Sequence, residues 1–200
     1  MRSRRSVYCI IAVLASLGLI REVLAADIYV TDPAHTLVGF TARHFVINKV
    51  RGKFNEFVGT ITYDENDITK SALKGTIKTA SIDTDNEKRD NHLRSADFFD
   101  VANYPDITFI SKRVEKRQND HVLIGDLTIR GVTREVAFPF TITGKIVQGG
   151  KTRIGFEANL RLNRQEYGVS WNKTMDSGGL VVSDTIEIEL VGEAIKEGNV

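Results

Sequence analysis

Apolar and polar residues alternate along most of the chain after residue 27, with the period of two that is typical of β-strands. Each run has one apolar and one polar face, which favours antiparallel strands, because strands of parallel sheets are buried on both faces. We therefore expect about eight long strands and one short one. The runs cover residues 37–43, 57–63, 73–78, 107–112, 123–129, 136–142, 153–162 and 185–190, with the short run at 28–30.

Turn residues between these runs predict an up-and-down order. Gly131 separates two alternating runs, and Gly149 and Gly150 separate the next two, so neighbouring strands are expected to pair as hairpins. Pro139 has no N–H to donate to a ladder and lies on the outward face of its run. We expect a bulge or an edge position there.

Eight antiparallel strands can form a sandwich or close into a barrel that holds packed side chains or one ligand. Gly59, Gly75, Gly125 and Gly144 lie on the apolar face of their runs, where a dense core would use larger side chains. Such glycines either leave room for a ligand or mark bends of the barrel. The sequence thus predicts an all-β fold with an eight-stranded antiparallel barrel.

One short helix is expected between the third and fourth long strands. Thr84 or Asp85 can cap it, and Leu93 supplies an apolar contact. The adjacent Phe98 and Phe99 follow it outside any strand. They either plug one end of the barrel or anchor a long connection to the sheet.

The sequence contains no recognisable catalytic or metal-binding motif. The four histidines include no pair at the spacing of metal ligands, and no nucleophile elbow, phosphate loop or dinucleotide fingerprint occurs. Arg89, Asp90, His92 and Arg94 form the densest polar cluster. It is either a solvated helix face or a set of cations at the barrel mouth. We predict no catalytic residues, no metal and no cofactor.

The first 26 residues resemble a secretory signal peptide, with a basic head, a short apolar run and small residues at Ala25 and Ala26. The remaining residues, 27–200, are expected to form one domain without a membrane span. Basic and acidic residues nearly balance, with a formal net charge of +1 for the whole chain. A nucleic-acid partner is therefore not expected.

Several motifs along the chain together resemble the YceI-like family of polyisoprenoid-binding barrels. The matching segments are Asp32-Pro33-Ala34-His35, Phe40-Thr41-Ala42-Arg43-His44, Val50-Arg51-Gly52-Lys53-Phe54, Asp83-Thr84, Arg89-Asp90, His92-Leu93-Arg94, Asp97-Phe98-Phe99, Tyr104-Pro105, residues 125–133, Asn163-Arg164 and Tyr167-Gly168. They occur in the family's order and cover nearly all of residues 27–200. The resemblance implies a lipocalin-like barrel, a periplasmic location and a long isoprenoid or related lipid held in the interior without covalent chemistry.

Because the resemblance implies a lipid in the interior, the inward-facing residues are candidate ligand contacts. The set is Phe40, Ile61, Gly75, Ile77, Phe98, Phe99, Phe109, Leu123, Gly125, Leu127, Phe138, Phe140, Phe156, Ile186 and Ile188. Arg89 and His92 are the candidates for holding a head group. An enzyme that acts on a lipid head group and a ligand-free stress or adhesion module are the alternatives, and a homodimer is left open.

Overall fold

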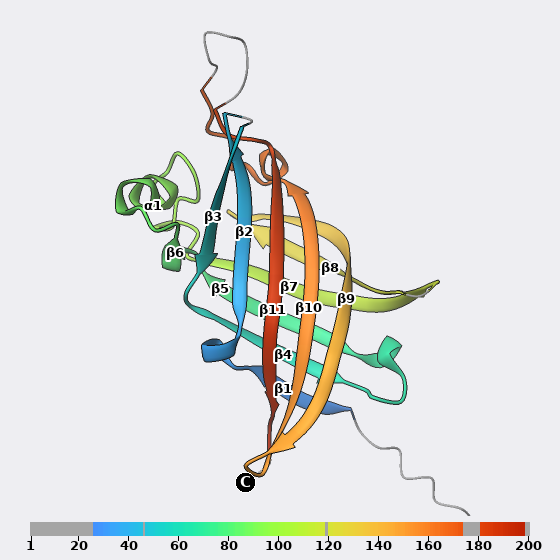
Figure 1. Ribbon diagram of the computed structural model, residues 1–200. Helices are drawn as coiled ribbons and strands as arrows, with labels where there is room; N and C mark the ends of the chain where they lie inside the picture. Colours follow the sequence, from blue (N-terminus) through green and yellow to red (C-terminus); the bar gives the residue numbers. More distant parts are fainter. Residues whose placement is uncertain (1–25, 46, 119, 174–180, 199–200) are drawn as a thin grey trace, which may run out of the picture.

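The computed structural model describes residues 26–45, 47–118, 120–173 and 181–198, which form strands, one α-helix and short 3₁₀-helices (Figure 1). The α-helix is α1 (Glu87–Arg94), and the 3₁₀-helices are Pro33–His35, Ile68–Lys70, Thr79–Ser81 and Arg164–Tyr167. The strands are β1 (Asp27–Thr31), β2 (Leu37–His44), β3 (Asn48–Phe54), β4 (Phe57–Tyr63), β5 (Ala72–Lys78), β6 (Ile82–Asp83), β7 (Asp106–Arg117), β8 (Asp120–Ile129), β9 (Val132–Gln148), β10 (Lys151–Asn163) and β11 (Thr185–Lys196).

Eight of these strands close into an antiparallel barrel. They follow the order β1-β4-β5-β7-β8-β9-β10-β11, and β11 pairs back onto β1 through Tyr29 and Lys196. Every strand pair is antiparallel, and most neighbours in the ring are also neighbours in sequence. The expected eight-stranded antiparallel barrel is therefore confirmed.

The remaining strands, β2, β3 and β6, form a branch. It starts from the edge of β11 that also pairs with β1. One end of β11 pairs with β1, and the other end pairs with β2 through residues 187–191. The ring therefore contains the short strand β1 and not the long run at 37–43, which corrects our strand assignment. β3 and β6 were not predicted as strands; β3 carries three basic residues and a glycine, and β6 has two residues.

A polar network holds the break between β1 and β2 at the 3₁₀-helix Pro33–His35. The Asp32 carboxylate accepts hydrogen bonds from the Ala34 N–H (3.1 Å) and from Arg153 Nη1 (3.0 Å), and it lies 3.0 Å from His35 Nδ1. Arg153 Nη1 also donates to Glu193 Oε2 at 3.3 Å. These contacts tie the break to β10 and β11, so the change of partner along β11 is fixed by side chains as well as by the ladder.

Irregularities in β9 let this long strand leave one neighbour and join the other. Pro139 is exposed and lies opposite Val122 of β8, while the pairing of β9 with β10 ends at Phe140. Pro139 thus has an edge-like position on its β10 side, as expected. The register with β10 shifts between Gly155 and Phe156.

Helix α1 covers the end of the barrel where the branch diverges from the ring. Its N-cap is Asn86, whose side chain accepts from the Arg89 N–H at 3.0 Å, so the expected caps Thr84 and Asp85 are wrong. Thr84 instead donates its N–H to the buried Asp90 carboxylate at 3.0 Å. Leu93 packs against the core, as predicted.

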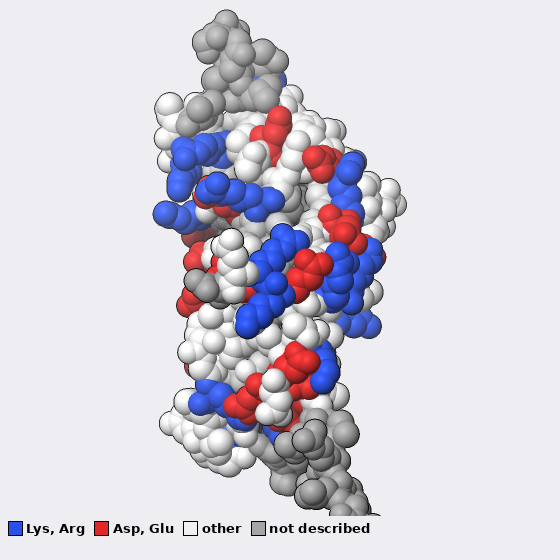
Figure 2. Space-filling view, turned by 90° about the vertical axis from the view of Figure 1, so that its right-hand side faces the viewer, with Lys and Arg blue, Asp and Glu red and all other residues white. Residues whose placement is uncertain are grey.

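Charged side chains of both signs cover the outside of the barrel. Figure 2 shows Lys and Arg next to Asp and Glu on the face that it presents, without a continuous field of one sign. Cross-strand ion pairs such as Lys112 with Asp126 and Glu135 contribute to this mixture. None of the helices in the described ranges is long and apolar enough to cross a bilayer.

We predict that Asp32→Asn lowers the free energy of unfolding by about 1.5 to 3 kcal/mol at neutral pH, because it weakens charge-assisted hydrogen bonds. Hydrogen bonds from His35 first, and then from Arg153 and the Ala34 N–H, hold the pKa of Asp32 below its usual value. A depressed carboxyl pKa stabilises the folded state above the unfolded pKa, and this stabilisation is lost as pH falls through the folded pKa.

Urea unfolding at neutral pH and near pH 3 checks this expectation. The difference between wild type and Asp32→Asn should shrink at the lower pH. Asp120→Asn, at an exposed position, is the control and should differ little from wild type at either pH. A difference for Asp32→Asn that does not depend on pH would contradict the prediction.

Candidate functional site

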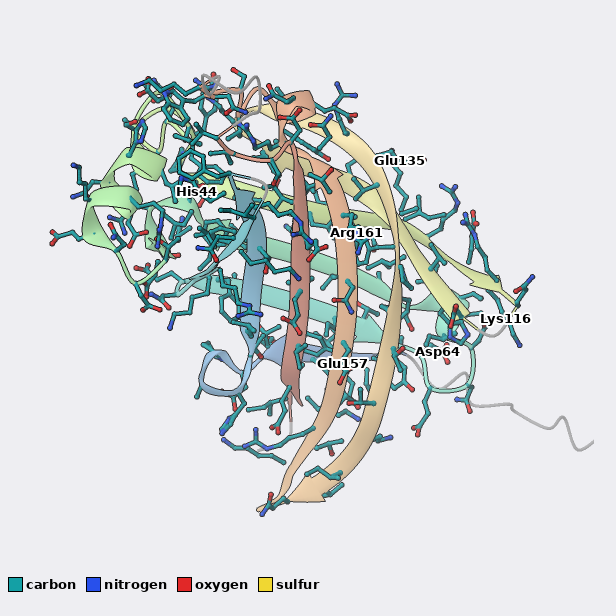
Figure 3. All side chains as sticks on the ribbon, turned by 45° about the horizontal axis from the view of Figure 1, so that its top comes forward. His44, Asp64, Lys116, Glu135, Glu157 and Arg161 are labelled. Carbon is teal, nitrogen blue, oxygen red and sulfur yellow. The ribbon has the colours of Figure 1, made fainter. Side chains whose placement is uncertain are left out.

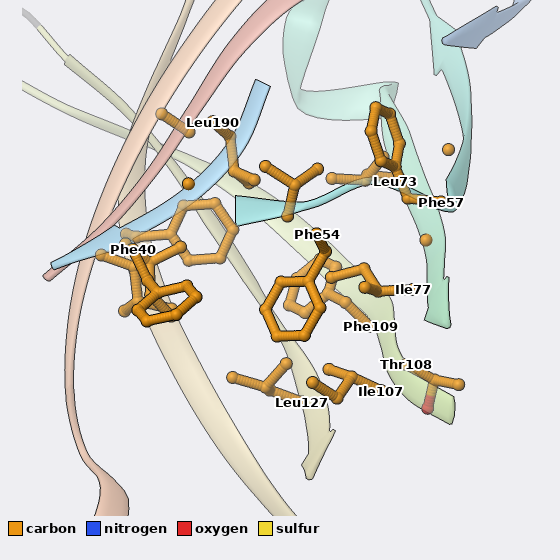
Figure 4. A pocket seen from close by; sticks show the side chains of 18 of the residues that line it. Phe40, Phe54, Phe57, Leu73, Ile77, Ile107, Thr108, Phe109, Leu127 and Leu190 are labelled. Atoms are coloured by element: carbon orange, nitrogen blue, oxygen red, sulfur yellow. The ribbon is translucent and has the colours of Figure 1, made fainter. Parts of the chain in front are cut away.

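The barrel encloses a cavity of about 280 Å³. Phe40 of the branch strand β2 lies across the cavity from Leu73 of β5 and Leu127 of β8 (Figure 4). The lining is mostly aliphatic and aromatic, with a few Thr and Ser hydroxyl groups and two charged residues, Glu157 and Arg164. A concave, apolar and enclosed space of this kind is the usual form of a small-molecule site.

The predicted contact residues line this cavity with one exception, Gly125. Those that line it are Phe40, Ile61, Gly75, Ile77, Phe98, Phe99, Phe109, Leu123, Leu127, Phe138, Phe140, Phe156, Ile186 and Ile188. Alternation identified them because successive side chains of a strand point to opposite faces. Further lining residues that we did not select include Val38, Phe54, Phe57, Leu73, Leu160, Leu162 and Leu190. Several of these share the same alternation, so the signal for them was present.

Gly125 is a packing position and not a wall of the cavity. A Cβ atom there would lie 2.5 Å from the Ile110 carbonyl oxygen and 2.6 Å from Cζ of Phe109. Gly125 pairs with Ser111 where the β7–β8 register shifts. The glycine thus lets Phe109 and the irregular part of β7 approach β8, which corrects our expectation that it borders the ligand.

Gly75 leaves open space on the cavity side of its strand. It lines the cavity, and a Cβ atom there would have only the Val58 carbonyl oxygen within reach, at 4.0 Å. Gly59 also lines the cavity, but its Cβ would collide with Thr31. Gly144 is exposed and lies beside the shift in the β9–β10 register. The glycines therefore differ: Gly75 leaves open space in the cavity, whereas Gly59 lies at a close contact and Gly144 beside a register shift.

An aromatic cluster closes the cavity at the α1 end. Phe98 and Phe99 line the cavity, and Phe98 is 6 % exposed. The Phe98 ring lies 5.1 Å from Trp171 and 5.0 Å from His92, and the His92 and Trp171 rings are 4.9 Å apart. The two phenylalanines therefore form an end wall of the interior.

Arg164 is a buried cation at the cavity wall, and we had not selected it as a site residue. Its guanidinium donates to backbone oxygens of Val169 (2.6 Å), Trp171 (2.9 Å) and Ser183 (2.9 Å) and lies 3.5 Å from the Asp184 carboxylate. Burial lowers the pKa of Arg164, and Asp184 acts in the opposite direction. The guanidinium thus joins two segments at this end of the barrel and is engaged by them.

Arg89 and His92, the candidate head-group residues, lie outside this cavity and line a separate shallow depression with Asn86 and Lys88. The Arg89 guanidinium donates to the Thr84 hydroxyl and carbonyl oxygens, both at 2.7 Å. His92 Nε2 lies 3.0 Å from the Asp97 carboxylate. The structure thus brings the two residues together outside the cavity, where the His92 ring contacts Phe98 of the cavity wall and Arg89 does not line the interior.

One group of potential metal ligands occurs among the described residues, formed by Asp32, His35 and Glu193. Their ligand atoms lie within 4.8 Å of one another. The Arg153 guanidinium already bridges Asp32 and Glu193. A positive side chain therefore occupies the place where a metal ion would neutralise the carboxylates.

We predict that Gly75→Leu keeps the barrel folded but weakens binding of a neutral apolar fluorophore, N-phenyl-naphthylamine, by about tenfold or more, because the added side chain occupies the cavity. Gly125→Leu should instead lower the free energy of unfolding by about 3 kcal/mol, because its Cβ collides with backbone atoms. Fluorescence titration and urea unfolding measure the two effects. Lys74→Leu places the same side chain on the outer face as a control. Unchanged fluorophore binding by Gly75→Leu would show that this position does not border the bound molecule.

The chain has clear relatives among known proteins. A family model described as YceI-like domain matches residues 29–194. A UPF0312 protein of Staphylococcus epidermidis is 35% identical over 164 residues, which cover 81% of this chain and 94% of that protein.

Solved structures agree with this match. A Campylobacter jejuni YceI protein is 33% identical with a TM-score of 0.67, and the match covers 78% of this chain and 90% of that one. A Saccharophagus degradans domain described as polyisoprenoid binding is 14% identical with a TM-score of 0.61, covering 86% of this chain and 99% of that one, and it supports the fold alone. The chain belongs to the YceI-like family.

Proposed function

We propose that this protein binds or carries a long-chain isoprenoid or a related lipid inside its barrel, without covalent chemistry. The observation that carries the proposal is the enclosed cavity, whose lining is mostly apolar. Transfer of a hydrocarbon chain from water into such a space is favourable and needs no directional contact. The Saccharophagus degradans domain, which shares this fold, is described as polyisoprenoid binding, and we extend that ligand class to this chain as part of the proposal.

The size of the hydrophobic gain favours a long chain. At about 0.3 kcal/mol per non-hydrogen atom, a chain of about twenty carbons gains about 6 kcal/mol, which corresponds to a dissociation constant of tens of micromolar. Tighter binding needs a longer chain or a held head group. Polyprenyl phosphates, quinones and fatty-acid derivatives meet these requirements.

The rival function, chemistry on a lipid head group, has its best candidates in Arg89, Asp90 and His92. Asp90 is buried and accepts hydrogen bonds from Thr84. The Arg89 guanidinium also donates to Thr84. Their contacts stabilise the start of α1, which favours a structural role for this cluster over catalysis.

The location and assembly of the protein are part of the same proposal. We infer export to the periplasm from the signal-like residues 1–26, nearly all of which lie outside the described residues. A periplasmic carrier would meet isoprenoid lipids at the membrane surfaces that enclose this compartment. Homodimer formation stays a prediction that sedimentation analysis of the exported protein would decide.

We predict that the purified, exported protein retains a lipid that solvent extraction and mass spectrometry identify, and that Gly75→Leu carries less of it per folded molecule. Native mass spectrometry of wild type should show the matching mass shift, which disappears after extraction. Conversion of the retained lipid into a product would favour the enzyme. An apoprotein that takes up no isoprenoid would support the ligand-free module.

The head-group prediction for Arg89 has its own test. If Arg89 holds an anionic group, Arg89→Ala should weaken binding of a polyprenyl phosphate by about 10- to 100-fold, the usual effect of one charge-assisted hydrogen bond, and leave the matching alcohol unchanged. Lys74→Ala, which removes a positive charge on the outer face of β5, is the control. Equal losses for both ligands would mean that Arg89 acts only through its hydrogen bonds to Thr84.

A further inference from the structure

The tip of the β2–β3 hairpin exposes large apolar side chains that the barrel does not use. Ile47 is 86% exposed and Phe45 is 41% exposed, and Ile47 is the most exposed large hydrophobic residue in the described part of the chain. Hairpin turns normally carry Gly, Asn, Asp or Ser, which suit both the backbone and the solvent. Folding therefore does not explain the composition of this tip.

The backbone of Phe45 also departs from what folding would favour. Its φ is 52°, in the left-handed region where Gly or Asn fits with less strain and where a bulky side chain is an outlier. The Phe45 N–H donates to the Val181 carbonyl oxygen at 2.9 Å, and its ring centroid lies 3.9 Å from that of His44. These contacts hold the exposed aromatic residue in a fixed position, although a smaller residue would suit the turn better.

Basic residues on the outward face of the hairpin stand behind the apolar tip. Arg43 is directly opposite Lys49, and Arg51 follows on the same face. Like charges in a cross-strand pair are destabilising. Lys49 lies 3.9 Å from Glu187, a distance at the limit of an ion pair, and no carboxylate partner of Arg43 or Arg51 occurs among the residues that the structure describes. The pattern leaves positive charge available to an anionic partner.

The hairpin stands at the end of the barrel that the aromatic cluster closes. Figure 1 shows β2 and β3 reaching beyond the barrel at the end where α1 lies. His44, at the end of β2, forms an isolated bridge with Val182, which lines the cavity. The exposed tip is therefore next to one end of the apolar interior.

We propose that this hairpin docks the barrel on an anionic lipid bilayer. Phe45 and Ile47 enter the boundary between head groups and acyl chains, and Arg43, Lys49 and Arg51 contact the lipid phosphates. Arg43 and Lys49 are two residues from the apolar tip and Arg51 is four, so at about 3.3 Å per strand residue they lie about 7 Å and about 13 Å behind it. The nearer spacing matches the depth of about 5 to 10 Å at which interfacial segments lie. The docking surface goes beyond the proposed lipid carriage, since it does not depend on what the cavity holds.

The β9–β10 hairpin provides a matched control. It exposes Val147 (71%) and Ile146 (55%) in a similar apolar tip. Two of its three neighbouring cations are neutralised, because Lys145 pairs with Glu65 and Arg153 pairs with Asp32 and Glu193, which leaves Lys151 as the cation without a carboxylate partner among the described residues. An apolar tip with this smaller free positive charge should select an anionic bilayer more weakly.

Vesicle flotation of the exported protein tests the proposal. Wild type should bind vesicles of phosphatidylcholine with phosphatidylglycerol and should bind pure phosphatidylcholine poorly. Ile47→Ser should weaken binding by about tenfold, and each of Arg43→Gln and Arg51→Gln by about fivefold. Val147→Ser and Lys116→Gln should match wild type; Lys116 lies far from His44 at the end of β2 (Figure 3).

Two further measurements separate docking from folding and from carriage. Circular dichroism and fluorophore binding should be unchanged in Ile47→Ser, since that side chain is exposed and outside the cavity lining. Binding should be the same for extracted and lipid-loaded protein, so the failure of lipid carriage would leave this result intact. Equal vesicle binding by wild type, Ile47→Ser and Arg43→Gln would overturn the proposal. Binding to polyglutamate but not to anionic vesicles would also overturn it, in favour of an acidic protein partner.

Discussion

The architecture depends on how β11 shares one edge between two strands. β1 pairs with one end of that edge and closes the ring, while β2 pairs with the other end and leads the branch away from it. A single continuous strand would have continued the ring along its full length. The break at Pro33–His35, which Asp32 and Arg153 hold in place, therefore creates an end of the barrel that α1 and the aromatic cluster must cover.

The interior can stay hollow because strand pairing around the ring stabilises the barrel. The ladders satisfy the backbone groups, and the buried side chains of Tyr29, Ile154 and Ala194 form a cluster that packs against residues of the cavity lining such as Ile61 and Phe156. A glycine such as Gly75 then places no side chain in the cavity. The fold can tolerate this because closure does not require the centre to be filled.

Alternation predicted the strands and inward faces well, because the period of two directly determines which face a side chain occupies. Alternation failed where contacts from adjacent strands or backbone groups determine the role of a residue. The alternation placed Gly125 on the inward face of its strand. Only the pairing of β7 with β8 shows that Phe109 and the Ile110 carbonyl oxygen fill the space beside Gly125. Arg164 was missed for a related reason: its partners are mostly backbone oxygens of Val169, Trp171 and Ser183, which no side-chain pattern can identify.

Side chains close the α1 end of the cavity. At the α1 end, the wall consists of the Phe98, Trp171 and His92 rings and of segments that Arg164 joins through side-chain hydrogen bonds. Such a wall lacks the ladder pairing that holds the rest of the ring, and elements of this kind open locally at a lower free energy than core strands. The apolar tip at Ile47 lies at the same end. If that tip rests on a bilayer, the part of the wall that opens most easily faces the phase from which a hydrophobic ligand would come, so the ligand need not cross water.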